Sequence, residues 1–384
     1  MKLNEFKVER LFARNQQGVD YQLGASSCED FELKDILERA DAECLKMWEN
    51  LRLGYTNFQG HPKLRSAIAR RYKTIGPDDV IEASPEEGTF IVLNTMLDAG
   101  DEVIVMEPAM PSLHEIPHAI GCDVVPWKLE PTEWGWKLDI DFLSRAINQK
   151  TKLIILNIPN NPTGYAPVLT DLQRIAQIAD RRGIWIFSEE SYRGMERDPG
   201  SVIPPMADVY QRAISIGGLS RNGFPGTGVG WIASQSRTVM ANFLSYKDYT
   251  SLCPNAMSEI VAVIFFRNIQ EITLRNRKII LENVDLAEAY FKSHKEWFEW
   301  TPPNAGSTAF PKLMTPRRSN EFCDSAMKDA GLMLIPDRVF SVNLNRFRIG
   351  FGRKNFGIAL AKFSDFVDAH MVKSTDSEDI GETA

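Results

Sequence analysis

Residues 151–164 read Thr-Lys-Leu-Ile-Ile-Leu-Asn-Ile-Pro-Asn-Asn-Pro-Thr-Gly. The apolar run from Leu153 to Leu156 is typical of a strand that is buried on both faces of a parallel sheet. The Asn, Pro and Gly residues that follow predict a turn at the end of this strand. Similar strand patterns at residues 100–106 and 183–187 alternate with helical patterns. This alternation predicts an α/β fold in which helices cover both faces of a mainly parallel sheet.

The chain has 384 residues, a length that suits a large domain together with a smaller α+β domain. We predict the large domain at residues 45–275 and the small domain at residues 276–373. Residues 1–44 are expected to form an N-terminal arm and part of the small domain. Residues 374–384 are acidic and poor in apolar side chains, so we predict a disordered tail.

The composition excludes several classes of protein. A net charge of −7 gives no basic surface for nucleic acid, and no apolar run approaches the ~20 residues of a membrane-spanning helix. The N-terminal residues lack the apolar core of a signal peptide, and the five cysteines are scattered without metal-binding spacing. We therefore expect a cytoplasmic protein that binds neither nucleic acid, nor membrane, nor metal.

Three further motifs carry residues suited to binding or catalysis: Ser188-Glu-Glu-Ser-Tyr192, Pro225-Gly-Thr-Gly-Val-Gly-Trp231 and Arg346-Phe-Arg-Ile-Gly-Phe351. Together with residues 157–164 they resemble the class I/II aminotransferases, which are pyridoxal phosphate (PLP) enzymes of fold type I. The pattern is nearest to the branch that contains capreomycidine synthase and cysteine–sulfur lyases. The resemblance covers residues 45 to 365 and implies a fold-type-I architecture and a homodimer.

The resemblance also implies roles for single residues. It places Asn161 beside the 3-oxygen of the pyridine ring and makes Arg348 the clamp for the α-carboxylate of the substrate. Glu189 stands where the family has the aspartate that pairs with the pyridinium nitrogen, and Tyr192 matches the tyrosine that follows. Met110 stands where the family has an aromatic side chain against the ring, and a thioether offers no flat face.

Arg221 marks the main departure from the family. It follows Ser220 at the position of the lysine that forms the Schiff base with the cofactor. A guanidinium stays protonated at accessible pH and offers no nucleophilic lone pair, so it cannot replace that lysine.

The phosphate-binding positions depart as well. Gly218 replaces a hydroxyl residue and Gly228 replaces an arginine. Residues 84–88, Ser-Pro-Glu-Glu-Gly, predict a helix that begins with Ser84 as its N-cap and a capping box from Glu87. The proline has no N–H to give a phosphate, and the two glutamates would repel it.

These observations predict an aminotransferase-fold protein that has lost PLP binding and needs no cofactor. In this hypothesis it acts on a small amino-acid-like or carboxylate metabolite, with Arg348 and Asn161 binding and orienting the substrate. Glu189 and Tyr192 form an acid/base pair, and Arg221 is a fixed cation. Met110 and Ser220 complete the substrate-binding site.

Two alternatives remain open. In the first, PLP or pyridoxamine phosphate (PMP) is bound without a covalent bond, by Asn161, Glu189, Tyr192 and Ser220. In the second, the chain is a non-catalytic scaffold or regulatory subunit.

Overall fold

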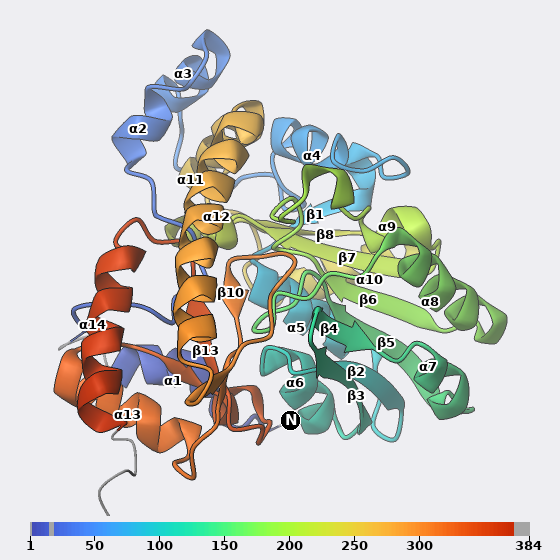
Figure 1. The fold of residues 1–384 in the computed structure, drawn as a ribbon. Coiled ribbons are helices and arrows are strands. Elements are labelled where there is room, and N and C mark those ends of the chain that lie inside the picture. The colour runs from blue at the N-terminus through green and yellow to red at the C-terminus, as the bar shows by residue number, and fades with distance from the viewer. Residues whose placement is uncertain (1, 15–18, 372–384) are drawn as a thin grey trace, which may run out of the picture.

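The computed structural model describes residues 2–14 and 19–371, so the predicted tail lies outside the described residues. A sheet of eight strands forms the centre of the molecule (Figure 1). The strands of this sheet are β1 (Val80–Glu82), β2 (Glu102–Glu107), β3 (Asp123–Thr132), β4 (Gly135–Leu138), β5 (Thr151–Asn157), β6 (Trp185–Glu189), β7 (Ala213–Gly218) and β8 (Gly230–Ala233).

The strand order is β1-β8-β7-β6-β5-β2-β3-β4. The neighbours from β7 through β6, β5 and β2 to β3 are all parallel, whereas β8 and β4 run antiparallel to their neighbours. The predicted mainly parallel α/β sheet is therefore confirmed, and the carboxyl ends of β5, β6 and β7 lie side by side at one edge.

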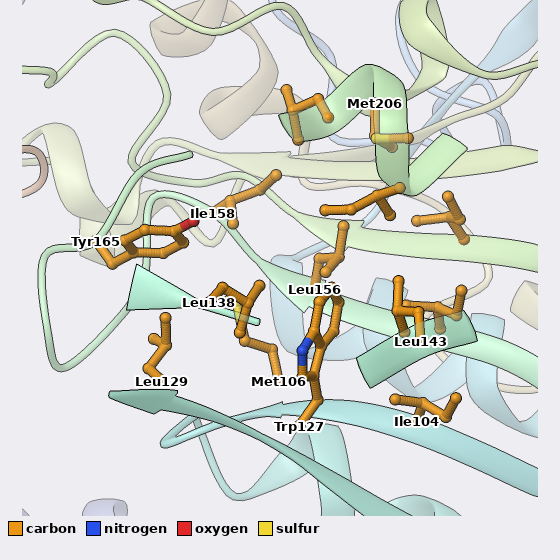
Figure 2. Close-up of a cluster of buried hydrophobic side chains, with 14 of the residues drawn as sticks. Ile104, Met106, Trp127, Leu129, Leu138, Leu143, Leu156, Ile158, Tyr165 and Met206 are labelled. Atoms are coloured by element: carbon orange, nitrogen blue, oxygen red, sulfur yellow. The ribbon is translucent and has the colours of Figure 1, made fainter. Parts of the chain in front are cut away.

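Helices cover both faces of the sheet because its strands are apolar on both sides. Ile104 and Met106 face a cluster with Leu143 of α7 (Asp141–Ala146; Figure 2) and with side chains of α8 (Leu169–Arg182). Val103 and Val105 face a second cluster with side chains of α5 (Pro85–Met96), α6 (Ser112–Ile120) and α10 (Arg237–Lys247). This alternation follows from the two-residue period of a strand. Each fully buried aliphatic side chain of this kind contributes roughly 1.5–3 kcal/mol to folding.

The helices on and around the sheet are α1 (Lys7–Arg14), α2 (Leu33–Leu37), α3 (Ala42–Glu49), α4 (Pro62–Ala69), α5 (Pro85–Met96), α6 (Ser112–Ile120), α7 (Asp141–Ala146), α8 (Leu169–Arg182), α9 (Met206–Val209), α10 (Arg237–Lys247) and α11 (Ala256–Arg267). Short 3₁₀ turns, η3 (Ser220–Asn222) and η4 (Pro225–Thr227), follow β7. None of the helices in the described ranges is long and apolar enough to cross a membrane.

The C-terminal part of the chain has a core of its own, built around aromatic side chains. It contains α12 (Ile269–Ser293), β9 (Phe298–Glu299), β10 (Thr308–Ala309), β11 (Lys312–Leu313), α13 (Ser319–Ala330), β12 (Ile335–Pro336), β13 (Phe347–Gly350) and α14 (Phe356–His370). Phe298, Phe322, Phe347 and Phe363 pack against one another in this core. Helix α12 runs continuously through residues 275 and 276, where we had predicted the domain boundary.

Two helix predictions need correction. The pattern from Asn255 to Lys292 predicts one long helix, but the structure has α11 and α12 with Asn268 between them. Asn268 is the C-cap of α11: its backbone N–H donates to the carbonyl oxygens of Ile264 and Phe265, and its side chain donates to those of Ile264 and Arg39.

The second correction concerns the start of α5. Ser84 is the N-cap as predicted, since its Oγ accepts a hydrogen bond from the Glu87 backbone N–H at 3.3 Å. The capping box does not form. The Glu87 carboxylate instead accepts a 2.6 Å hydrogen bond from Thr250 and lies 3.9 Å from the Lys247 ammonium.

Candidate functional site

A cavity of about 280 Å³ lies at the carboxyl edge of the sheet, next to the ends of β6 and β7. Ligands of open α/β sheets bind at this edge. The lining residues come from α1, from the loop that carries Ser26, from the starts of α5 and α6, from the end of β6, from the segment of η3 and η4 that follows β7, and from β13. They are Val8, Glu9, Phe12, Ser26, Ser84, Pro85, Glu86, Thr89, Met110, Ser112, Leu113, Glu189, Ser191, Ser220, Arg221, Phe224, Pro225, Gly228, Val229 and Arg348.

Glu189 ends β6 and points its carboxylate into this cavity. The Asn157 amide donates to one carboxylate oxygen at 2.5 Å, and the Ser191 backbone N–H donates to the other at 3.0 Å. Asn157 and Glu189 are paired residues at the ends of neighbouring parallel strands. The sheet itself therefore fixes the position of this carboxylate, as expected for a functional residue.

Arg348 reaches the cavity from β13 and is only 1% exposed. Its Nε donates to the carbonyl of Gly24 and its Nη1 to the side-chain oxygen of Asn161, each at 3.0 Å. Its Nη2 has no hydrogen-bond partner among the described residues. Burial, with a smaller contribution from the charge of Arg221, lowers the pKa of Arg348 to about 10. A buried guanidinium with a free donor fits an anionic ligand.

Asn161 and Met110 lie together beside Arg348. The Asn161 amide nitrogen donates to the Met110 sulfur at 3.2 Å, while its oxygen accepts from Arg348. Met110 lines the cavity, but Asn161 is 1% exposed and lies behind it. Asn161 therefore orients Arg348, and it is not among the residues that line the cavity.

Arg221 lies in η3, which follows β7. By the family resemblance, it occupies the position of the lysine that forms the Schiff base with the cofactor. Its Nη1 donates to the Ser26 hydroxyl at 2.5 Å, and its guanidinium lies 5.4 Å from the centre of the Tyr192 ring. Its Nε has no hydrogen-bond partner among the described residues. The lining residues of the cavity include Arg221 and Arg348 but no lysine.

The predicted acid/base pair of Glu189 and Tyr192 does not form. The Tyr192 hydroxyl donates to the carbonyl of Ser26 at 2.5 Å, and Tyr192 is not one of the residues that line the cavity. Its ring lies under Arg221 instead. Tyr192 is therefore placed to position Arg221, because the Ser26 carbonyl captures the hydroxyl that a proton transfer would need.

Glu86 brings a second carboxyl group into the cavity from the first turn of α5. Its side chain is exposed to the cavity space, but the surrounding protein raises its pKa, chiefly by desolvation. A hydrogen bond from Ser112 and the nearby charge of Arg221 oppose that rise in the pKa. Of the two glutamates that we expected here, only Glu86 lines the cavity.

Gly218, at the end of β7, is explained by its contact with α5. A Cβ atom at this position would lie 2.4 Å from Cγ of Pro85. Ser220, two residues later, lines the cavity. The glycine and the proline therefore depend on each other, because the close approach of α5 to β7 excludes a side chain at 218.

The sequence arguments missed part of the site. Ser26 and Ser191 line the cavity, as do Val8, Glu9 and Phe12 of α1. Residues 21–28 read as a polar Gly/Ser loop, which is a signal for the Ser26 contact. The amphipathic pattern of α1 predicts a helix but not the surface that it covers.

Known proteins resemble the chain over most of its length. Capreomycidine synthase of Streptomyces vinaceus is 27% identical over 323 residues, which cover 81% of this chain and 80% of that protein. The crystal structure of a PLP-dependent aminotransferase from Streptococcus suis matches with a TM-score of 0.89 at 27% identity, covering 96% of this chain and 99% of the other. The PLP-dependent cyclase OrfR matches with a TM-score of 0.87 at 24% identity, covering 96% and 98%.

The prediction that no cofactor is used is contradicted by these matches. The Streptococcus suis structure is described as PLP-dependent and matches almost the whole of both chains, which points to PLP as the cofactor. The sequence argument failed because it equated the missing lysine and the changed phosphate loop with loss of the cofactor. Hydrogen bonds and charge can hold a ligand without a covalent bond.

The extent of the family match agrees with the geometry of the cavity. Residues 22–357 match the family described as aminotransferase class I and II, a range that includes both the sheet and the strand carrying Arg348. The cavity lies at the carboxyl ends of parallel strands and combines a sheet-bound carboxylate with a buried arginine. This protein belongs to the aminotransferase class I and II family.

Proposed function

We propose that the protein is an enzyme that binds PLP or PMP without a covalent bond and acts on a small amino-acid-like substrate with a carboxylate. The observation that carries this proposal is the arrangement of Arg348 and Glu189 on one cavity. Arg348 offers a buried, unpaired Nη2 to a carboxylate, and Glu189 is held rigidly at the end of β6.

The ring end of the cavity fits the cofactor. Glu189 supplies a fixed carboxylate for a pyridinium nitrogen, and Ser191 adds a buried hydroxyl without a hydrogen-bond partner among the described residues. Met110 provides an apolar contact for the ring, and Asn161 lies directly behind it. The carboxylate and the free hydroxyl are the groups that a pyridine ring with polar substituents requires.

The phosphate end fits with fewer donors than the family's loop provides. The hydroxyls of Ser84 and Ser220 line the cavity, and Arg221 contributes a cation whose Nε is free. Glu86 is compatible with a phosphate in its protonated form, which the raised pKa favours. A charge-assisted hydrogen bond from Arg221 is worth ~1.5–3 kcal/mol, so reversible binding is the expected mode.

In this proposal each residue of the cavity has a separate role. When bound, the cofactor supplies an electron sink for negative charge that develops at the substrate's α-carbon. Arg348 binds and orients the α-carboxylate, and Asn161 keeps its guanidinium in place. Glu189 holds its carboxyl group in a fixed position at the ring end. The Tyr192 hydroxyl is not available for proton transfer, because it donates to the carbonyl of Ser26. Glu86, whose pKa is raised, is instead the carboxyl group placed to hold a proton at its side-chain oxygen.

The test is a spectroscopic titration of the purified protein with PLP and with PMP. We expect saturable binding of both, loss of both on dialysis, and no pyridoxyl adduct on any peptide after borohydride reduction. Arg221→Lys places an amine at the cavity and should produce such an adduct with PLP at residue 221. An adduct in the unmodified sequence, or no binding of either cofactor, contradicts the proposal.

We also propose that the protein is a homodimer in the cytoplasm. Leu53, Tyr55 and Tyr249 are 83–92% exposed. The segment with Leu53 and Tyr55 is joined to the segment with Tyr249 by a 2.8 Å hydrogen bond from the Thr56 hydroxyl to the carbonyl of Pro254. Neighbouring exposed apolar side chains support a protein contact. All five cysteines are unpaired, which supports a reducing compartment.

A further inference from the structure

Helix α1 contributes one wall of the cavity, and that wall carries both apolar and charged groups. Val8 and Phe12 are four residues apart and therefore lie on the same face of the helix. Both line the cavity, and so does Glu9 between them. Met110 and Leu113 add further apolar surface to the lining. The cavity thus has an apolar passage with a carboxylate on its rim.

Glu9 lines the same cavity as Arg348 and Glu86 without forming an ion pair with Arg348. Burial lowers the pKa of Arg348 and raises that of Glu86, and the charge of Glu9 makes a smaller upward contribution to both pKa values. Within residues 2–14 and 19–371, the Glu9 side chain makes no hydrogen bond or ion pair, and it is exposed to solvent. Arg348 also keeps its free Nη2. A cation and an anion therefore remain available to the same ligand.

We propose that Glu9 selects substrates that carry a cationic group at the end of an aliphatic side chain. This inference rests on the proposed function, in which Arg348 binds the α-carboxylate. From that fixed end, Val8, Phe12 and Leu113 contact the aliphatic part of the side chain, and Glu9 meets the terminal ammonium or guanidinium. An acidic side chain would be repelled by Glu9, and a neutral one would gain nothing from it. Dibasic amino acids such as lysine and arginine have this chemistry.

The test is calorimetric binding of matched amino acids to the protein saturated with PMP, whose amine does not condense with an amino acid. L-Lysine is compared with L-norleucine, which lacks the terminal ammonium, and L-arginine with L-citrulline, which lacks the charge. We expect the cationic member of at least one pair to bind about fivefold more tightly, the upper end for a solvent-exposed charge pair. Glu9→Gln should reduce that preference to less than twofold and leave binding of the neutral member unchanged.

Two control variants separate this effect from others. Glu49→Gln removes the same charge from α3, away from the cavity, and should retain the full preference. Glu9→Asp keeps the charge and should retain part of the preference for the cationic amino acid. Equal binding within both pairs, or a preference that survives Glu9→Gln, overturns the inference while the proposed function stands. If PMP binds but none of the four amino acids does, this inference fails while the proposed function stands; if PMP itself does not bind, the proposed function fails.

Discussion

Two arginines near the start of β13 show how a functional side chain differs from a structural one. Arg346 and Arg348 are both buried. Arg346 pairs with the Glu299 carboxylate and donates to the carbonyl of Phe310 at 2.8 Å. Arg348 has polar but uncharged partners and a free Nη2. Since an unpaired buried charge is costly, its retention here argues for a ligand that supplies the anion.

Arg348→Lys should weaken binding of a substrate carboxylate by roughly ten- to a hundredfold, because lysine keeps the charge but loses the bidentate fork, worth ~1.5–3 kcal/mol. Calorimetric titration with the amino acids that bind the unmodified protein measures the loss. Arg346→Lys is the matched control, which should lower the melting temperature and leave the dissociation constant unchanged. An unchanged dissociation constant in Arg348→Lys would make Arg348 a structural residue.

Glu86 gives the site a predictable dependence on pH. Its pKa is raised in the folded protein, so as pH rises through that value the carboxyl becomes charged and repels the cofactor phosphate. Glu86→Gln should therefore bind PMP several-fold more tightly than the unmodified protein above the pKa of Glu86, and equally well below it. The ratio of the two dissociation constants across pH is the measurement, since the phosphate's own titration cancels. A ratio independent of pH would exclude Glu86 from the phosphate end.

At this scale the sequence predicted residue types better than contacts. The cavity lining includes Arg348, Glu189, Ser220 and Met110, which the sequence motifs singled out as residue types suited to a site. The direction of the Tyr192 hydroxyl depends on a carbonyl 166 residues earlier in the chain, and no local pattern encodes that distance.

At the scale of elements, the approach of α5 to β7 explains two of the departures together. Gly218 and Pro85 are in contact because a Cβ at 218 would meet the proline ring. The sequence showed both changes but not that one requires the other. Similarly, the alternating strands and the Ser84 cap could be predicted from local patterns, whereas the hydrogen bond from Asn268 to the carbonyl of Arg39 joins residues that lie far apart in sequence.

Gly218→Ser should lower the free energy of unfolding by ~1–3 kcal/mol, the usual cost of overpacking a close contact. In the Pro85→Ala background the same change should cost less, by at least ~0.5 kcal/mol, because the clashing ring atoms are gone. Urea denaturation of the four combinations gives the coupling. Gly226→Ser is the control, because a Cβ there meets open space, and it should stay within ~0.5 kcal/mol of the unmodified protein. Equal costs of Gly218→Ser in both backgrounds would refute the coupling.

At the scale of the whole molecule, the cavity unites segments that are distant in the chain. Arg348 is hydrogen-bonded to residues 187 and 324 positions away, so the site exists only when the C-terminal core packs on the sheet. The alternation of strands and helices predicted the sheet, and the family resemblance implied that Arg348 contributes to the site. The position of α1 over the cavity could not be predicted, because an amphipathic helix does not specify which apolar surface it covers.

The exposed apolar side chains beside β1 lead to a prediction about assembly. Leu53 and Tyr249 are 84% and 92% exposed, and their segments are joined through the Thr56–Pro254 hydrogen bond. If a second copy covers them, sedimentation equilibrium should give twice the 43.4 kDa mass of one chain. Leu53→Asp combined with Tyr249→Asp should shift the protein to monomer, because buried carboxylates without partners are costly. Trp134→Asp is the control: Trp134 is 86% exposed between β3 and β4, at the opposite edge of the sheet from β1, and its replacement should leave the dimer intact. A monomeric unmodified protein would contradict the proposed dimer. A double variant that stays dimeric would place the dimer contact elsewhere.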